Sequence, residues 1–433
     1  MSTDAAAPSP PALPAAPAKE PFPPTFYYAN AIELFERLAH YGTYIILSLY
    51  LSDVIKFDDI GSASLLGNFR LVGSIAPVVC GAIADRITFK RSLIVSFVLY
   101  AAGYSLLFAA PSKALAATAL FAMAIGGGFL KPVVTGTVVR TAPPGREAEG
   151  FGVFYRMVNA GSVVGKSAAY LTRFLLGLRY VMINSVFASF IALGLAAFAY
   201  KEPERGGPAK QSLGETLRGF GSALKNPRFT GFLLVFAGYY FMAEQFYMTF
   251  PKYVTRHIDP KAPLEIITLI NPALIALFQG PIARLCKRWH ALSVMLVGVL
   301  IGALSMLVMG TVPGLVGACC SGALFAVAEM CFTHRYYESI ASFAPEGKAG
   351  LYMGLSFVPS GIGAWIGGQV SGPMLAKYLP ANATVPLPGG LHFYRDPFAV
   401  WGLYALLGVG CAVLMLGYRL AAKPKVASTL PAS

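Results

Sequence analysis

Three ionisable residues inside one apolar segment are the part of this sequence best suited to chemistry. Glu33, Glu36 and Arg37 interrupt the run from about 26 to 51, which can cross a bilayer as a helix at about 20 residues per span. Spacings of three and four residues place both carboxylates and the guanidinium on one helical face. Because burial of these groups in hydrocarbon is costly, we expect them to face an internal cavity. The segment predicts a membrane protein that moves a polar solute together with protons.

Other apolar segments also contain isolated ionisable residues: Lys131, Glu244 and Glu329. If their helices meet near mid-membrane, these groups can line one cavity. A carboxylate can take up or release a proton when its basic partner moves away. Glu36 near Lys131, or Glu33 paired with Arg37, are therefore candidate proton relays. The alternative is a set of fixed ion pairs that only hold helices together, and each additional buried charge makes it less favoured.

Hydropathy defines the elements that must position these residues. Hydrophobic residues make up 56% of the 433 residues and charged residues 12%, with a mean hydropathy of +0.61, which is typical of a membrane protein. Backbone groups in lipid are satisfied within helices, so the fold class is an all-α membrane protein. Apolar runs predict twelve transmembrane helices, near 26–51, 61–84, 91–111, 113–137, 150–172, 179–200, 229–253, 264–284, 290–312, 314–341, 349–376 and 397–420.

The distribution of charge predicts how the chain is oriented. The net charge is +14, and lysine and arginine concentrate in alternate loops, for example Lys90 and Arg91 and the segment 201–228. The intervening loops contain fewer basic residues. This positive-inside pattern predicts that both termini are cytoplasmic. It favours anionic lipid over nucleic acid as the partner of the basic face, in a cell membrane that we expect to be a bacterial inner membrane.

The predicted helices divide into two halves. The expected regions are an Ala/Pro-rich disordered tail (1–25), a six-helix bundle (26–200), a cytoplasmic linker (201–228), a second six-helix bundle (229–420) and a cytoplasmic tail (421–433). Short matches between the halves, such as 81–91 with 280–288, indicate an internal repeat. Such a repeat predicts two parallel bundles with a solute site between them at mid-membrane.

A short polar motif closes the second predicted helix. It consists of Gly81, Asp85, Arg86, Lys90 and Arg91. An aspartate at the helix end followed by arginines predicts a cytoplasmic latch between the halves that engages in one transport state and releases in another. The alternative is a basic loop that only orients the chain.

Other classes of chemistry have little support in the sequence. The six cysteines lie in or at the ends of predicted spans without paired spacing in an outer loop, so we expect neither a disulfide nor a metal site. The glycines 126–128 lie inside a predicted span, where helix packing explains them. With no soluble domain, we expect no enzyme activity, no catalytic residue and no cofactor besides protons as the coupling ion.

Taken in order along 26–420, the motifs resemble those of the proton-coupled oligopeptide transporter family of the major facilitator superfamily. The first segment is similar to the family's E-x-x-E-R-F-x-Y-Y-G signature, with Leu38 and His40 as departures. Residues 126–132 resemble its G-x-G-x-x-K-P motif, and residues 154–162 its F-Y-x-x-x-N-x-G-S motif. Three further matches are Glu244-Gln245, Ile270-Asn271-Pro272 and Glu329 with its downstream Ala344-Pro345.

The resemblance implies a fold of two six-helix bundles and roles for individual residues. The residues implied in proton coupling are Glu33, Glu36, Arg37, Lys131 and Glu244. Glu329 is implied to meet the amino terminus of a peptide, and Asn159 to contact the substrate. Tyr41 and Tyr155 are the tyrosines that we expect in the pocket, together with Lys131.

One departure from the family bears on the substrate. Peptide-carrying members usually have an arginine where this chain has Tyr44, which supplies a hydroxyl but no charge for a substrate carboxylate. Arg70, Arg156 and Lys166 are charges not expected at their positions in the family, and one of them can restore a cation from another helix. Tyr44 and Arg156 are therefore included among the candidate substrate-binding residues.

These observations predict a proton-coupled symporter of di- or tripeptides that works by alternating access. The alternatives are a proton-linked carrier of another small organic solute, including an exporter, and a transporter-derived sensor that no longer cycles. The buried charges of the first segment, Lys131 and Glu244 argue against the sensor, because a protein that does not couple protons has no need of them.

Overall fold

The described part of the chain is entirely helical. The computed structural model describes residues 20–109, 112–203, 213–346, 348–381 and 395–421. The first half contains α1 (Pro24–Tyr44), α2 (Leu47–Leu49), η1 (Tyr50–Val54), α3 (Asp59–Ile87), α4 (Phe89–Ala109), α5 (Lys113–Thr141), α6 (Glu147–Leu176), η2 (Leu178–Tyr180), α7 (Val181–Gly194) and η3 (Leu195–Ala199). The linker contains α8 (Leu213–Leu224). The second half contains α9 (Pro227–Met248), α10 (Phe250–Tyr253), η4 (Val254–Ile258), α11 (Leu264–Ile267), α12 (Ile270–Cys286), α13 (Ala291–Thr311), α14 (Gly314–Phe343), α15 (Ala349–Leu355), α16 (Val358–Tyr378) and α17 (Arg395–Ala421).

The predicted all-α membrane class is confirmed, and the spans follow the apolar runs. Eight helical segments in the described ranges are long and apolar enough to cross a membrane. Four further helices have sufficient length, since α1, α6, α9 and α16 contain 21, 30, 22 and 21 residues. Two of these four, α1 and α9, contain the buried acids Glu33, Glu36 and Glu244. The count of twelve spans therefore rests on eight apolar helices and four less apolar ones.

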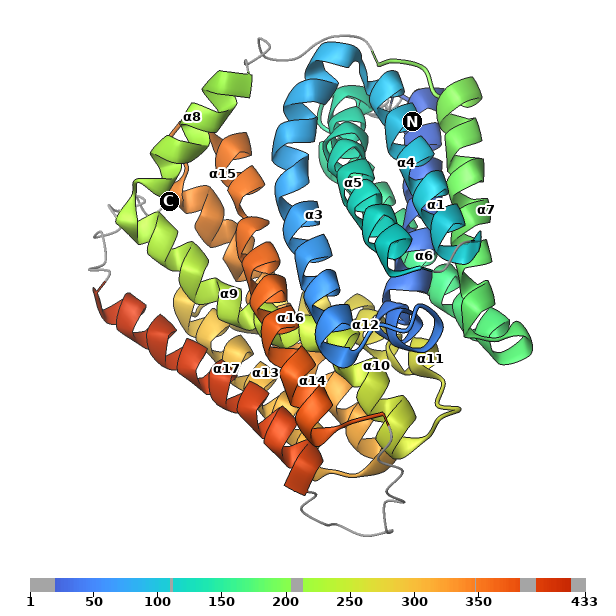
Figure 1. Ribbon diagram of the computed structural model, residues 1–433. Coiled ribbons are helices and arrows are strands. Elements are labelled where there is room, and N and C mark those ends of the chain that lie inside the picture. Colours follow the sequence, from blue (N-terminus) through green and yellow to red (C-terminus); the bar gives the residue numbers. More distant parts are fainter. Residues whose placement is uncertain (1–19, 110–111, 204–212, 347, 382–394, 422–433) are drawn as a thin grey trace, which may run out of the picture.

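The helices form two bundles, each with its own hydrophobic core. One core is built almost entirely from residues between Phe22 and Tyr200, and the other mainly from residues between Ala223 and Met415. In Figure 1 the blue to green helices α1 to α7 form one group, and α9 to α17, coloured from yellow-green to red, form the other. The site can therefore be described by what each half contributes.

Small residues bring the halves together along α3 and α16. A methyl group added at Gly67 would lie 3.0 Å from the carbonyl oxygen of Ala364, and one at Gly361 would lie 2.8 Å from the Cβ of Ser74. Small side chains allow helix backbones to approach closely in a membrane. The long contact of α3 with α16, visible at the centre of Figure 1, is consequently the main packing seam between the halves.

The linker contains a helix that the sequence analysis did not predict. Helix α8 has 12 residues, too few to cross a membrane, and it packs against α15, where Gly219 meets Leu351 and Gly354 meets Phe220. Figure 1 shows α8 beside α15 at the end of the molecule where α3 finishes. Within 1–25, only residues 20–25 lie in the described ranges, and α1 begins at Pro24; within 421–433, only Ala421 does.

Helix α1 is held against α6 by glycines. A methyl group added at Gly161 would lie 2.5 Å from the carbonyl oxygen of Leu34 and 2.7 Å from the Cβ of Arg37. A methyl group at Gly165 would collide with the carbonyl oxygen of Leu38. Because α1 contains the buried carboxylates, this contact fixes their position relative to α6.

We predict that Gly161→Ala lowers the stability of the protein by about 1–3 kcal/mol, because the added methyl overpacks backbone that cannot move away. Gly194→Ala is the matched control, since nothing lies within 4 Å of its added methyl and its φ of −60° suits alanine. We expect Gly194→Ala to be neutral or to stabilise by up to about 1 kcal/mol. Thermal unfolding in detergent measures both, and equal melting temperatures for the two variants would refute the close-packing argument.

Candidate substrate and proton-coupling site

The charged residues of α1 form one compact buried cluster. Arg37 Nε lies 2.8 Å from Oε1 of Glu33 and 2.6 Å from Oε2 of Glu36. Both glutamates are 3% exposed, and the hydroxyl of Tyr100 donates to Oε1 of Glu36 over 3.2 Å. The helical spacing thus places the three groups together. Since two carboxylates share one guanidinium, one of them can take up a proton while the other keeps its ion pair with Arg37.

Lys131 of α5 is the basic neighbour of this cluster. Its ammonium acts electrostatically on Glu36, and Glu33, Glu36, Arg37 and Arg70 act on it in turn. It forms no direct ion pair with these described residues, and its Nζ lies 5.7 Å from the ring centre of Phe357 in the second half. Lys131 therefore lies between the carboxylate cluster and the interface of the halves.

A second charged group joins the two halves at Glu244 of α9. Its side chain is 3% exposed and accepts from Arg70 of α3, with Nη2 at 2.5 Å and Nε at 3.0 Å from Oε1. The hydroxyl of Tyr44 donates to Oε2 over 2.7 Å. One carboxylate of the second half thus binds a guanidinium and a phenol of the first half.

This arrangement accounts for the departure at Tyr44. The tyrosine is 4% exposed and its hydroxyl is occupied by Glu244. The guanidinium of Arg70 lies 5.3 Å from the centre of the Tyr44 ring, so a cation from α3 lies beside this position, although it is paired with Glu244. The sequence analysis identified Arg70 as an unexpected charge but gave no means of finding its partner.

His40 lies between the two charged groups. Its ring stacks on Tyr44 with centroids 5.2 Å apart, and Tyr44 in turn packs on Tyr247 of α9 at 4.5 Å. The charges of Arg37, Arg70 and Lys131 all act on the imidazole. Along α1, the acids, His40 and Tyr44 form one stripe that runs from the buried carboxylate cluster to the Glu244 group.

A cavity of about 260 Å³ opens beside Glu244, between the halves. Its charged lining residues are Arg70, Lys166, Glu244 and Glu329. Most of the remaining wall comes from the second half and is aromatic or hydroxylic: Tyr239, Tyr240, Phe246, Tyr247, Phe250, Thr268, Phe325, Thr333, Tyr337 and Ser360. The cavity can therefore hold a small polar solute against both charges and aromatic faces.

Two of the predicted substrate-binding residues, Glu329 and Tyr41, and one residue noted only as an unexpected charge, Lys166, take different places at or near this cavity. Glu329 lines it and accepts a hydrogen bond from Asn271 Nδ2 at 3.1 Å. Lys166, 3% exposed, lines it from α6 and donates to the carbonyl oxygen of Thr268 over 3.1 Å. Tyr41 is half-buried, with its ring centre 5.8 Å from the Nζ of Lys166.

The predicted residues Tyr155, Arg156 and Asn159 do not line this cavity. All three are exposed, and Tyr155 is 62% exposed. Asn159 lies seven residues before Lys166, two helical turns along α6, and so shares the face that Lys166 turns toward the second half. Toward its amino-terminal end this face of α6 is no longer covered by the second half.

Ion pairs close the other end of the interface. Asp59 at the start of α3 lies 2.8 Å from Nζ of Lys252 and 2.9 Å from Nη2 of Arg256, both in the second half. Near the end of α6, Arg173 forms a two-bond ion pair with Glu265 of α11, at 2.7 and 2.9 Å. We call these the Asp59-end contacts. They fasten the halves together on the predicted outer side.

The predicted latch lies at the opposite end of α3. Arg86 and Arg91 are exposed, and a methyl group added at Gly81 would lie 3.4 Å from the ring of Pro132 within its own half. The side chain of Asp85 lies outside the described part of the structure. Between side chains that the structure describes, the ion pairs that join the halves are the Glu244 pair and the Asp59-end contacts, so Arg86 and Arg91 have no partner in the second half here.

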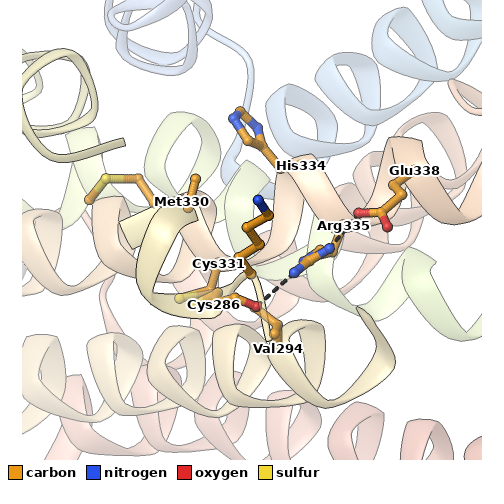
Figure 2. Close-up of a pocket in the computed structure, with 9 residues that line it drawn as sticks. Cys286, Val294, Met330, Cys331, His334, Arg335 and Glu338 are labelled. Carbon is orange, nitrogen blue, oxygen red and sulfur yellow. Dashed lines mark hydrogen bonds and ion pairs between the residues drawn. The ribbon is translucent and has the colours of Figure 1, made fainter. Parts of the chain in front are cut away.

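A second, smaller pocket lies wholly within the second half. It has a volume of about 150 Å³, and Figure 2 shows His334, Arg335 and Glu338 along it with Cys286 and Cys331 below. Arg335 lies 2.7 Å from Glu338 and donates to the carbonyl oxygen of Cys286 over 2.6 Å. Arg335 and Glu338 are therefore paired with each other, and since α12, α13 and α14 enclose the pocket, it is not part of the interface between the halves.

Buried charges around a cavity between two helical bundles define a membrane transporter. The family model of the Major Facilitator Superfamily matches residues 32–368, so the chain belongs to that superfamily. It is 26% identical over 346 residues to the multidrug resistance protein MdtH of Escherichia coli O157:H7, covering 79% of this chain and 81% of the relative, and equally to that of Shigella boydii.

Solved structures share the fold at low sequence identity. A POT family transporter in complex with 5-aminolevulinic acid matches with a TM-score of 0.73 and 15% identity, over 91% of this chain and 95% of its own. The peptide transporter POT in complex with sulfate matches with a TM-score of 0.74 and 16% identity, over 92% and 94%. The major facilitator fold is thereby confirmed. Since family and neighbours are transporters, the chain is a transporter and not an enzyme.

We predict that Glu265→Gln destabilises the protein by about 3–5 kcal/mol, because it leaves Arg173 without its charge partner in a buried pair whose acid is 0% exposed. Glu338→Gln is the matched control, since that acid is 60% exposed in its pair with Arg335 and its removal costs at most about 1 kcal/mol. Thermal unfolding compares the two variants. Similar losses in both would show that the Arg173–Glu265 pair does not hold the halves together.

Proposed function

We propose that this protein is a proton-coupled transporter that moves a small organic solute, in the first place di- or tripeptides, by alternating access. The observation that carries the proposal is the position of Glu244, a buried carboxylate of one half that is bound to Arg70 and Tyr44 of the other. A proton on Glu244 removes its negative charge and weakens the ion pair with Arg70. Protonation thus acts on a contact that must break when the halves separate.

The described conformation supports a transport cycle of this kind. The Asp59-end contacts join the halves on one side, while the predicted latch residues Arg86 and Arg91 form no ion pair with any described residue of the other half. With the Arg86 end on the cytoplasmic side, as the charge pattern predicts, this is an inward-facing arrangement. In the opposite state the Asp59-end contacts break and the latch engages.

The α1 cluster provides a place for the coupling proton. Glu33 and Glu36 share Arg37, and Lys131 acts on the cluster from α5. We assign to these residues the uptake and release of a proton, with His40 and Tyr44 along the same helix face between the cluster and Glu244. The α1 cluster does not line the solute cavity, so we assign the coupling of proton binding to solute binding to the movement of the two halves.

Size and lining support small polar solutes. The cavity of about 260 Å³ is below the roughly 300–1,000 Å³ usual for drug-sized ligands. Its charged residues suit a solute that carries charges of its own, and tyrosine hydroxyls and aromatic faces can bind a short peptide backbone. POT family neighbours bound to small molecules are consistent with this class of solute.

A second candidate is a proton-linked carrier of a non-peptide organic solute, including an exporter. Two observations favour it: position 44 has no cation, and the cavity wall is rich in aromatic rings. The relatives named multidrug resistance protein MdtH point the same way. We place either carrier in a bacterial inner membrane with both termini cytoplasmic, where a proton gradient is available.

The proton assignment predicts the behaviour of three variants. Glu33→Gln, Glu36→Gln and Lys131→Ala should each reduce gradient-driven accumulation of solute to the background of empty liposomes, because each removes a charge of the proton site. Exchange of labelled for unlabelled solute without a gradient should survive in at least one of them. The measurement is uptake into proteoliposomes with an imposed inward proton gradient.

Glu147→Gln is the control for this series, since Glu147 is exposed at the start of α6 and remote from the cluster. It should accumulate solute like the unmodified protein. Normal accumulation by all three test variants would show that the α1 cluster and Lys131 do not handle the coupling proton.

The choice of solute has its own test in the same liposomes. We expect labelled dialanine and trialanine to accumulate only when the proton gradient and Lys131 are both present, which identifies a peptide symporter. An aromatic dye such as ethidium, loaded inside, should then leave at the rate of empty liposomes. Gradient-dependent dye movement without peptide uptake would instead select the second candidate.

A further inference from the structure

Lys166 is a buried cation whose role the proton mechanism does not use. It is 3% exposed, it lies on α6 in the first half, and it lines the cavity. Burial of a lysine without a charged partner is costly. Among the described residues, its ammonium forms no direct ion pair, so its retention in the cavity wall calls for a function.

The backbone around Lys166 holds the ammonium at one place. Neighbouring Gly165 packs against Leu38 of α1, and residue 166, about 100° further around the helix, leaves α6 beside this contact, with its ammonium 5.8 Å from the ring centre of Tyr41. It reaches the carbonyl oxygen of Thr268, at the end of α11, over 3.1 Å. That carbonyl is available because Pro272, four residues later, has no N–H to donate to it.

The ammonium still has donors to offer. A lysine ammonium has three N–H groups, and the described residues provide one acceptor, the Thr268 carbonyl. The other two N–H groups belong to a lysine side chain that lines the cavity. An anionic group of a solute would satisfy them with a charge-assisted hydrogen bond, which is stronger than a neutral one.

The opposite charge of the cavity is Glu329 in the second half. Each of these two groups acts electrostatically on the other, yet they form no direct ion pair. Glu329 accepts from Asn271 at Oε2, and the described residues provide no donor for Oε1. The other two charges of the cavity, Arg70 and Glu244, already neutralise each other at 2.5 Å.

We propose that Lys166 binds the anionic group of the solute, across the cavity from Glu329, which the family resemblance already implies for the solute's amine. We call Lys166 and Glu329 together the two-pole site. The proposal rests on the proposed transport function and assigns the solute's free acid to a residue of α6. Because the poles belong to different halves, the bound solute links them. Lys166 thereby takes the place of the cation that Tyr44 does not supply.

The test uses the purified full-length protein in detergent and three probes that differ only at their ends: dialanine, dialanine amide and N-acetyl-dialanine. The unmodified protein should bind dialanine at least about tenfold more tightly than either blocked probe, since each blocked probe loses one charge-assisted contact. 5-Aminolevulinic acid and its methyl ester form a second pair with the same expectation. Isothermal titration calorimetry gives the dissociation constants.

Variants assign each pole. Lys166→Gln should weaken binding of dialanine about tenfold and change binding of dialanine amide by no more than about twofold. Glu329→Gln should also weaken binding of dialanine about tenfold, but it should change binding of N-acetyl-dialanine by no more than about twofold. Lys166→Arg should retain the preference for the free acid, which shows that charge and not packing is responsible. Lys377→Gln, the same substitution at an exposed lysine of α16, should change neither constant.

The contrary results are equally definite. If Lys166→Gln weakens the acid and the amide alike, or neither, Lys166 does not bind the solute's anionic group. If the blocked probes bind the unmodified protein as well as the zwitterions, or if no zwitterion binds, the two-pole site is wrong. Zwitterion binding without gradient-driven uptake would instead overturn the proton coupling and leave the two-pole site standing.

Discussion

The carboxylate of Glu244 is the interaction on which the arrangement of the two halves depends. It is buried, and its charge is satisfied by Arg70 and Tyr44 from the opposite bundle. A buried ion pair contributes little net stability, but removal of one partner is strongly unfavourable. The halves are therefore held together at mid-membrane by a contact that a single proton can weaken. At the other end, Asp59 has two cations within 2.9 Å, so a proton on this carboxylate would have to replace two charge partners instead of one.

Glycine and proline positions determine where the charged groups can meet. Gly161 and Gly165 let the backbone of α1 lie against α6, and this brings the α1 carboxylates to a fixed depth in the first bundle. Gly67 and Gly361 do the same for α3 and α16, so that Arg70 can reach Glu244 across the interface. Pro272 frees a carbonyl for Lys166. The polar site is thus a consequence of close backbone packing.

Much of the fold could be read from the sequence, because long apolar runs leave helices as the only structures that satisfy their backbone in lipid. The α1 cluster was also predictable, since residues three and four apart share a helical face whatever surrounds them. The partner of Glu244 was not predictable in this way. Arg70 is 174 residues away, and nothing in the local sequence shows that Arg70, and not Arg156 or Lys166, is the partner of Glu244.

The expectation that Lys131, Glu244 and Glu329 can line one cavity is met by only two of them, for the same reason. Glu244 and Glu329 line the cavity and Lys131 does not. The depth of a residue in the membrane follows from the local pattern, but the rotation of its helix is set by packing. Tyr155 and Asn159 lie on the face of α6 that the second half leaves uncovered. Whether the second half covers these two residues depends on how far the halves have rotated, and a sequence does not specify one such state. Helix α8 was missed because its 12 residues lie in a polar linker.

The separation of proton and solute groups has a mechanistic consequence. If the solute's ammonium and the coupling proton competed for one carboxylate, binding of one would exclude the other. Among the described residues Glu329 accepts a hydrogen bond from Asn271 but forms no ion pair, so it can receive the solute, while Glu33, Glu36 and Glu244 have basic partners. Solute and proton can then be bound together, as a symporter needs. In the described structure they are linked through the interface, where Lys166 and Glu329 line one cavity from opposite halves and Arg70 pairs with Glu244.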